Sequence, residues 1–414
     1  MATSPATVSR RSLPDGWRWA RLGNVCRVVG GSTPKSGVPN YWDGNILWVT
    51  PTDLGRLDGN LITSSARRIT QAGYDRSGTE MVPPGTVVLS SRAPIGHLGI
   101  AGSALCTNQG CKSFVPGPDV DSAFLYFALK SAVPVLKAMG SGAIFAEVSK
   151  SQLQEFEVPL PPLPEQRRIA ALLATQMAAV ERARRAAAAQ VAAARALPAA
   201  YLREVFESAD AQRWPRIPLG EAGVIVSGIT LGRKLNGAAT REVPYLRVAN
   251  VKDGYLDLAD VYTIEATEAE IQKCRLQCGD LLLTEGGDAD KLGRGTFWEE
   301  QIPNCIHQNH IFRVRFDRER FSPQFVAAQV GSSYGKAYFL AHAKQTTGIA
   351  TINQGVLSRF PLMAPSLDEQ RRTMAKLGEQ LAAAERVRSA AAEQLAAINH
   401  LPAALLRRAF AGEL

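Results

Sequence analysis

The chain contains one long stretch twice, and this duplication limits the possible folds more than any other feature. Residues 165–206 align with residues 369–410 without a gap at a constant offset of 204, and 25 of the 42 positions are identical. Ten of these identities are alanines, which two Ala-rich helices could share by chance, but the other fifteen include Gln176, Pro198 and Phe206. A match of this length indicates an internal duplication, so two equivalent halves are expected.

Both copies are predicted to be long helices that pack against each other. Residues 165–196 contain no Gly or Pro and consist mainly of good helix formers, and the second copy starts with Ser366 and Glu369 at capping-box spacing. Apolar residues recur at alternating spacings of four and three, which is typical of a coiled-coil seam. The seam positions are Leu173, Met177, Val180, Ala187, Val191 and Ala194 in the first copy, and Leu377, Leu381, Ala384, Ala391, Leu395 and Ile398 in the second. An antiparallel helix pair is therefore expected, with Pro198 and Pro402 interrupting the two helices.

One seam position in each copy is an arginine. Arg184 and Arg388 either lie at the edge of the seam or fix the register of the helices, and the edge is favoured. The resulting rod would have approximate two-fold symmetry and two equivalent faces.

The segments before the helices also resemble each other, although more weakly. Residues 17–34 are similar to 214–230, 82–96 to 276–289, and 106–116 to 306–316. They are short β-branched runs broken by Gly, Pro, Asn and Asp, which indicates strand-rich domains with long loops. The predicted fold is α+β, with two tandem strand-rich domains that are each followed by a long helix. Its expected parts are a disordered tail (1–14), a first domain (15–157), a central helical region (158–207), a second domain (208–361) and a C-terminal helical region (362–414).

The charge balance gives a weak indication of a polyanionic partner. The net charge is +9, but residues 12–157 carry 13 basic and 11 acidic side chains, and residues 208–361 carry 18 and 17. Any contact with nucleic acid must therefore come from particular loops. No apolar run approaches the ~20 residues of a membrane span, and residues 1–14 lack the apolar stretch of a secretory signal. A cytoplasmic protein without a membrane is expected.

The cysteines leave one question open. Six cysteines in 414 residues do not form a disulfide framework. Cys274, Cys278, Cys305 and His307 have spacings that a zinc site could use, but buried thiols and a polar loop histidine are favoured over a metal.

No catalytic motif is found in the sequence. The stretch 29–36 resembles a phosphate-binding loop, but Val29 and Pro34 stand where that loop requires glycine. Paired-metal carboxylates and an activated Ser or Cys near a His are not recognisable either. A binding protein without catalytic residues is therefore expected.

The repeated features resemble the specificity subunit of a Type I restriction-modification system. The resemblance covers nearly the whole chain and rests on four features. They are the Pro-rich entry and Glu-Gln at 161–166 and again at 365–370, the two long helices, the closing AFAGEL (409–414), and GGSTPKSGVPNYWDGNILWVTPTDL (30–54), which is typical of the start of a target-recognition domain.

The resemblance implies a non-catalytic subunit that binds double-stranded DNA. Each target-recognition domain would read one half of a split, asymmetric sequence, and the helices would set the gap. The helices would also dock two methyltransferase subunits, which use S-adenosylmethionine to methylate adenines, and restriction subunits that use ATP could join them. No cofactor is expected in this chain. The docking and spacer residues would be those at the two helix starts, namely Glu165, Gln166, Arg167, Glu369, Gln370 and Arg371.

Candidate DNA contacts are the polar and basic residues of the loops in each domain. Asn, Gln and Arg can make paired hydrogen bonds to base edges, whereas Lys more often contacts phosphate. The candidates are Thr33, Lys35, Tyr41, Ser91, Arg92, Asn108, Gln109 and Lys112 in the first domain, and Arg233, Lys234, Arg241, Lys291, Arg294, His307, Gln308 and Asn309 in the second. Tyr41 and its neighbour Trp42 fit packing better than base stacking. The second copy has LGRKLNGAATRE (231–242) where the first has residues 35–42, which fits a different half-site.

Two alternatives remain open at this point. The chain could be a coiled-coil scaffold that joins partners without reading nucleic acid, or a DNA nuclease with an unrecognised site. Metal-dependent cleavage by the isolated chain would favour the nuclease, and complex formation that is insensitive to DNA would favour the scaffold.

Overall fold

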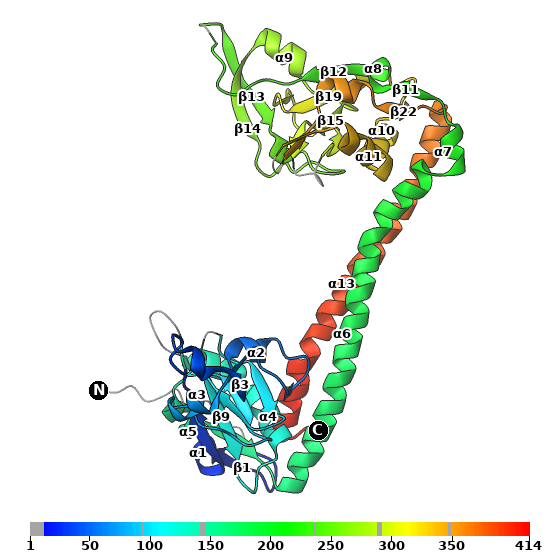
Figure 1. The fold of residues 1–414 in the computed structure, drawn as a ribbon. Coiled ribbons are helices and arrows are strands. Elements are labelled where there is room, and N and C mark those ends of the chain that lie inside the picture. Colours follow the sequence, from blue (N-terminus) through cyan, green and yellow to red (C-terminus); the bar gives the residue numbers. More distant parts are fainter. Residues whose placement is uncertain (1–11, 93, 141–145, 236, 288–291, 347–348) are drawn as a thin grey trace. The chain divides into compact units, whose positions relative to one another are not determined.

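The computed structural model describes residues 12–92, 94–140, 146–235, 237–287, 292–346 and 349–414 (Figure 1). Most of the expected N-terminal tail, residues 1–11, lies outside the described residues. The chain forms two compact units, one comprising residues up to 187 with 394–414, and the other comprising residues 188–393. The division crosses both long helices, so each unit contains one strand-rich domain and part of each helix.

The first unit is built on a five-stranded sheet with the order β2-β9-β6-β7-β4. A three-stranded sheet, β5-β3-β8, and a strand pair, β1-β10, complete it. The strands are β1 (Arg18–Arg21), β2 (Cys26–Gly30), β3 (Trp42–Val49), β4 (Leu61–Ile62), β5 (Arg67–Ile69), β6 (Val87–Ser90), β7 (Leu98–Ala101), β8 (Leu105–Thr107), β9 (Cys111–Pro116) and β10 (Glu157–Leu160). The helices are α1 (Leu22–Val25), η1 (Pro39–Tyr41), α2 (Pro51–Gly55), α3 (Gln71–Asp75), α4 (Ser122–Met139) and α5 (Lys150–Glu155).

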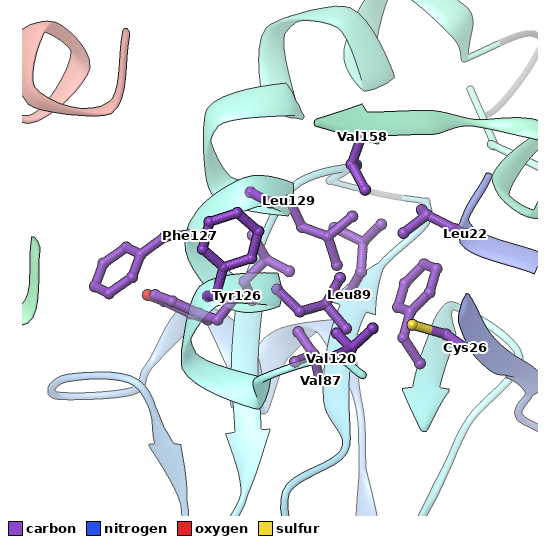
Figure 2. Close-up of a cluster of buried hydrophobic side chains, with 14 of the residues drawn as sticks. Leu22, Cys26, Val87, Leu89, Val120, Tyr126, Phe127, Leu129 and Val158 are labelled. Carbon is purple, nitrogen blue, oxygen red and sulfur yellow. The ribbon is translucent and has the colours of Figure 1, made fainter. Parts of the chain in front are cut away.

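The core of the first unit lies between the large sheet and α4 (Figure 2). The Asp121 side chain caps α4 by accepting a hydrogen bond of 2.9 Å from the backbone N–H of Phe124. Leu129 of α4 and Leu89 of β6 are completely buried in the same cluster, and burial of one such side chain stabilises a fold by about 1.5–3 kcal/mol. Among the described helices, α4 alone is long and apolar enough to cross a membrane, and 39% of it is buried in this core.

The second unit repeats this plan with a four-stranded sheet, β12-β19-β15-β17, and a three-stranded sheet, β14-β13-β18. A further small sheet, β16-β21-β20, and the pair β11-β22 are also present. The strands are β11 (Arg216–Pro218), β12 (Gly223–Ser227), β13 (Thr240–Leu246), β14 (Tyr262–Thr267), β15 (Leu281–Thr284), β16 (Gly286–Gly287), β17 (Gly295–Phe297), β18 (Ile306–His307), β19 (Ile311–Phe316), β20 (Lys344–Thr346), β21 (Ile349–Thr351) and β22 (Pro361–Met363). The short helices are α7 (Ala209–Arg213), α8 (Leu219–Ala222), η2 (Val248–Asn250), α9 (Glu268–Cys274), α10 (Pro323–Gly331), α11 (Ser333–His342) and α12 (Gln354–Ser358).

The second unit has the helix pair α10 and α11 where the first unit has the single helix α4. Ser332 has an extended backbone (φ −72°, ψ 169°), and its hydroxyl oxygen accepts a hydrogen bond from the N–H of Gly335. The serine therefore ends one helix and caps the next.

The long helices are α6 (Leu163–Phe206) and α13 (Leu367–Phe410), with 44 residues each. The parts of α6 and α13 that belong to one unit lie side by side (Figure 1). The first core contains Leu173 near the start of α6 and Leu406 near the end of α13, whereas the second unit joins Phe206 at the end of α6 with Met374 near the start of α13. This confirms an antiparallel pair.

The predicted seam residues are buried or half-buried along both helices. Arg184 and Arg388 are 48% and 39% exposed, as expected at the edge of the seam, and each forms an ion pair with a glutamate one turn earlier in its own helix, Glu181 and Glu385. The expected interruptions at Pro198 and Pro402 are wrong, since both helices continue through the proline. A proline costs a helix one hydrogen bond, but the turns that follow are held by apolar contacts with the unit cores.

A buried glutamine joins each long helix to its own domain. In the first unit, Gln166 donates from Nε2 to the carbonyls of Asp119 and Pro161, both at 2.9 Å, and its Oε1 accepts from the N–H of Asp121 at 2.9 Å. In the second unit, Gln370 makes the same three bonds at 2.8–3.0 Å: its Nε2 donates to the carbonyls of Arg320 and Pro365, and its Oε1 accepts from the N–H of Ser322. We call these two arrangements the amide clamps.

Candidate nucleic-acid interface

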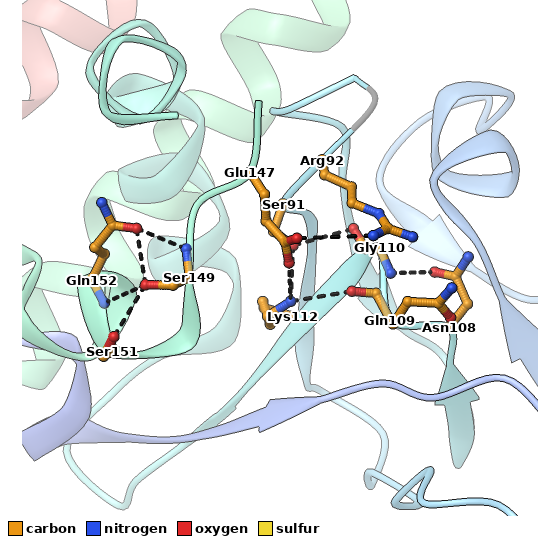
Figure 3. Close-up of polar contacts among 10 residues, drawn as sticks. All are labelled: Ser91, Arg92, Asn108, Gln109, Gly110, Lys112, Glu147, Ser149, Ser151 and Gln152. Carbon is orange, nitrogen blue, oxygen red and sulfur yellow. Dashed lines mark hydrogen bonds and ion pairs between the residues drawn. The ribbon is translucent and has the colours of Figure 1, made fainter. Parts of the chain in front are cut away.

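In the first unit, three segments bring most of the predicted contact residues together (Figure 3). They are the turn between β8 and β9, the end of β6, and the segment that precedes α5. We call this group rim 1; its residues are Ser91, Arg92, Asn108, Gln109, Lys112 and Glu147, together with Thr33 of the loop after β2, whose hydroxyl bonds to the Gln109 side chain. The backbone fixes their positions, since the N–H of Ser91 donates to the carbonyl of Gly110 at 2.8 Å and the N–H of Val148 donates to the carbonyl of Ser91 at 2.9 Å.

The turn itself is shaped by its own side chain and by a close backbone approach. The Asn108 side chain accepts a hydrogen bond of 3.0 Å from the N–H of Gly110, which is the pattern of an Asx turn. Gly31 passes so close that a Cβ atom there would lie 2.0 Å from the carbonyl oxygen of Asn108. Only glycine fits at this position without moving the turn.

Lys112 and Glu147 form the charged centre of rim 1. The Nζ atom of Lys112 donates to the Ser91 hydroxyl at 3.1 Å, to the carbonyl of Gln109 at 3.2 Å and to Glu147 Oε1 at 3.2 Å. Arg92 lies 3.9 Å from the other carboxylate oxygen of Glu147. A buried ammonium group is costly without partners, so these three bonds explain how Lys112 remains in a nearly buried position.

Rim 1 presents only part of the predicted set to solvent. Thr33, Lys35 and Gln109 are exposed, and Arg92 and Asn108 are half-buried. Ser91 is completely buried, so the expectation that it contacts DNA is wrong; its hydroxyl holds Lys112 instead. Tyr41 is half-buried and packs against the cluster of Trp42, Trp48, Ile69 and Cys106; its contact with DNA stays a prediction.

The second unit repeats this backbone arrangement with other side chains. The N–H of Glu285 donates to the carbonyl of His310 at 2.9 Å, as Ser91 does to Gly110, and the N–H of Ile352 donates to the carbonyl of Glu285 at 2.8 Å. Gly228 repeats the close approach, since a Cβ atom there would lie 1.9 Å from the carbonyl oxygen of His307. We call this group rim 2; its residues are Glu285, Arg294, Gln308, Asn309, His310 and Thr351.

The two rims keep side-chain amides at the first two turn positions (Asn108 and Gln308, Gln109 and Asn309) but differ in chemistry at the other equivalent positions. Phe312 stands where rim 1 has Lys112, because both are the second residue of the strand after the turn. His310 replaces Gly110, and its Nδ1 lies 2.5 Å from Oε2 of Glu285. Two related backbones therefore carry two different sets of hydrogen-bonding groups.

Among the predicted contacts of the second unit, two are held in structural roles. His307 is completely buried, with Nδ1 3.1 Å from the carbonyl oxygen of Ile311, and burial lowers its pKa to about 4. His307 was expected to contact DNA, but its ring is enclosed in the protein and uncharged at neutral pH, so this expectation is wrong. Arg233 donates two hydrogen bonds to Glu270, and this pairing lowers the pKa of the glutamate to about 2.

The remaining candidates of this unit differ in accessibility. Lys234 and Arg241 are exposed, and Arg241 lies 3.3 Å from Glu268. Gln308 is half-buried and accepts from the N–H of Val248, while Asn309 lies 3.3 Å from the His310 ring. Arg294 is half-buried. Lys291 lies outside the described residues.

The predicted docking residues at the helix starts divide in the same way. Gln166 and Gln370 are completely buried in the amide clamps and have both amide hydrogens bonded, so they are not available to a partner, which corrects their assignment. Arg167 and Arg371 are exposed. Glu165 pairs with Arg168 at 2.7 Å, and Glu369 accepts from the Trp214 ring N–H at 3.0 Å.

The possible metal ligands do not gather. Within the described ranges, no group of three His, Cys, Asp or Glu side chains is placed to hold a metal ion. Cys274 and Cys305 are buried in two different apolar clusters, while Cys278 is exposed.

Four rim residues were not predicted from the sequence, namely Glu147, Glu285, His310 and Thr351. Carboxylates are not obvious DNA contacts, since phosphate repels them, and no local motif marks these positions. Their equivalence becomes visible only when the backbone hydrogen bonds of the two rims are compared.

The family comparison agrees with this arrangement. Residues 14–188 match the family described as the Type I restriction modification DNA specificity domain. The MjaIX specificity subunit of Methanocaldococcus jannaschii is 37% identical over 163 residues, which is 39% of this chain and 38% of that protein. The EcoKI specificity subunit of Escherichia coli K12 is 23% identical over 98% of this chain and 91% of its own length.

Two solved structures share the fold over nearly the whole chain. One comes from a study of complex assembly and conformational transition of the Type I restriction-modification system; it has a TM-score of 0.72, 21% identity, and covers 98% of this chain and 100% of the other. The other is the HsdS subunit from Thermoanaerobacter tengcongensis, with a TM-score of 0.64, 20% identity, and 98% and 99% coverage.

Proposed function

Since the chain belongs to the specificity subunits of Type I restriction-modification systems, we propose that it selects the DNA target of such a complex and catalyses no reaction itself. The observation that carries this proposal is the pair of rims. Both rims are built on the same backbone hydrogen bonds, yet outside the two amide positions of the turn their side chains differ in chemistry. Two such surfaces suit the reading of two different half-sites of one asymmetric target.

The long helices then set the gap between the half-sites. An α-helix rises 1.5 Å per residue, so each 44-residue helix is about 66 Å long. One turn of duplex DNA measures about 34–36 Å. The length of the helices is therefore of the order needed to leave unread base pairs between the two contacts.

The duplication also supports the proposed partners. Two equivalent helix starts fit two identical methyltransferase subunits, which would supply S-adenosylmethionine and transfer the methyl group to adenine. Among the docking residues predicted at the two helix starts, Arg167 and Arg371 have exposed side chains that a partner can reach. Restriction subunits would bring ATP-dependent cleavage, and the complex would act in the cytoplasm, where the chromosome lies.

Mapping adenine methylation in the host genome tests the function directly. A split sequence that disappears when this chain is deleted and returns when it is restored is the expected result. Insertion of one helical turn between Ala187 and Ala188, matched by one turn at the equivalent place in the second helix, should lengthen the unread gap and leave both half-sites unchanged. An unchanged gap would refute the spacer role.

The alternatives give different results in the same system. A scaffold would form the complex without any sequence preference, and replacement of Arg92 and Arg294 would have no effect on methylation. A nuclease would cleave DNA in the presence of divalent metal as the isolated chain, without a methyltransferase.

A further inference from the structure

Each rim contains one carboxylate beside the turn, but the two carboxylates come from segments that are not equivalent. In rim 1 it is Glu147, from the segment before α5. In rim 2 it is Glu285, which follows β15. The two side chains retain comparable exposure, 37% for Glu147 and 32% for Glu285.

The backbone shows that the two carboxylates have exchanged places with a hydroxyl. Arg92 and Glu147 are paired in an antiparallel bridge, and Gly286 and Thr351 are paired in the same way. Ser91 directly precedes Arg92, and Glu285 directly precedes Gly286, so Ser91 and Glu285 are equivalent. Glu147 and Thr351 are equivalent because they are the partners of Arg92 and Gly286. Each rim therefore has one hydroxyl and one carboxylate at this place, in opposite order.

Each carboxylate is also held by a basic group of its own rim. Glu147 accepts from Lys112 and lies next to Arg92, whereas Glu285 is paired with His310. The Lys112 ammonium reduces the repulsion of phosphate by Glu147, and in both rims the contact with the basic side chain restricts the orientation of the carboxylate. The pairing leaves other lone pairs of each carboxylate free, because an ionised carboxylate offers about four acceptor sites.

An ionised carboxylate can only accept hydrogen bonds, which limits the bases it can recognise. In the major groove, the donors are the exocyclic amino groups of adenine (N6) and cytosine (N4), whereas guanine and thymine present acceptors there. A carboxylate facing guanine O6 or thymine O4 would be repelled.

We propose that Glu147 and Glu285 are specificity-determining residues, each of which accepts a hydrogen bond from the exocyclic amino group of an adenine or cytosine in the half-site read by its own rim. The inference rests on the proposed function. It adds which base groups each rim selects and which side chains select them.

The test uses the chain assembled with the methyltransferase of its host system and a DNA library with both half-sites randomised. Glu147→Gln gives the carboxylate position an amide that both donates and accepts. At one position of one half-site, discrimination against guanine and thymine should fall about tenfold or more, with the other half-site unchanged. Glu285→Gln should do the same in the other half-site. Glu80→Gln is the matched control, since Glu80 is also paired with an arginine, Arg27, but lies outside the rim; it should change neither half-site.

A second measurement separates direct reading from the positioning of Lys112. The base at the affected position is replaced by purine or 2-pyrimidinone, which lack the exocyclic amino group. The unaltered protein should methylate this DNA about tenfold or more weakly, and the glutamine variant should show little of this loss. If the unaltered protein tolerates the missing amino group, or if the variants reduce methylation of all targets equally with their preferences intact, the proposal is wrong. Should a variant fail to fold, the amino-less DNA with the unaltered protein decides the question alone. Absence of any split target for the unaltered protein would refute the proposed function instead.

Discussion

The amide clamp of Gln166 offers a quantitative test of how the long helix is attached to its domain. Substitution of Gln166 by leucine keeps the size of the side chain but removes three hydrogen bonds of 2.9 Å. The carbonyls of Asp119 and Pro161 and the N–H of Asp121 lose their partner. A buried polar group without a partner costs about 1–3 kcal/mol.

The expected destabilisation is about 3 kcal/mol, because three groups are affected and some of them can regain water at the loop. It is measured as the change in the free energy of unfolding in urea. The chain has two compact units, so two transitions are expected, and Gln166→Leu should shift only the one that belongs to the first unit. Gln370→Leu should shift the other by a similar amount, and the effects in the double variant should add.

Gln176→Leu is the matched control on the same helix. Its buried Oε1 has no hydrogen-bond partner among the described residues, so its replacement leaves no group unpaired and should change stability by less than about 0.5 kcal/mol. A loss below about 1 kcal/mol for Gln166→Leu, or a loss equal to that of the control, would refute the clamp.

Two further predictions concern residues that support the rims. Burial lowers the pKa of His307 from an ordinary value near 6.5 to about 4, so the unfolded state binds the proton first, and up to about 3 kcal/mol of the stability present above pH 6.5 should be lost as the pH falls toward 4. The free energy of unfolding, measured between pH 7 and 4, should lose this pH dependence in His307→Asn. An unchanged pH dependence would contradict the buried neutral ring. Gly31→Ala and Gly228→Ala place a Cβ atom about 2 Å from a carbonyl of the turn, so each should abolish sequence discrimination in one half-site in the methylation assay. Gly37→Ala is the control, since a Cβ atom there has no atom within 4 Å, and it should be neutral. Loss of discrimination in Gly37→Ala would show that the assay reports general damage.

The helices could be predicted from the sequence because their determinants are local and periodic. The spacing of apolar residues from Leu173 onward identified the seam, and the 204-residue offset identified its partner helix. The prolines were misjudged, since whether a helix continues past Pro198 depends on apolar contacts made by Phe206 with α10, which is distant in sequence.

The rims could be predicted only in part. The turn residues Asn108 and Gln308 were found because the two copies still align there, but Ser91 and His307 were assigned to the surface although both are buried. Polar residue type does not reveal burial when the partner that satisfies the side chain lies elsewhere in the chain.

The sequence by itself determined the duplication, the two long antiparallel helices and the presence of a polar turn in each strand-rich domain, because all three follow from repeats and spacing along the chain. Only the tertiary structure decided which polar groups face solvent and which hold the fold, as Gln166 and Lys112 illustrate. It also paired Glu147 with the end of β6, about 55 residues earlier in the chain. The physical reason is that burial and charge pairing depend on groups brought together by the backbone hydrogen bonds of the sheets, and these are not encoded in any single segment.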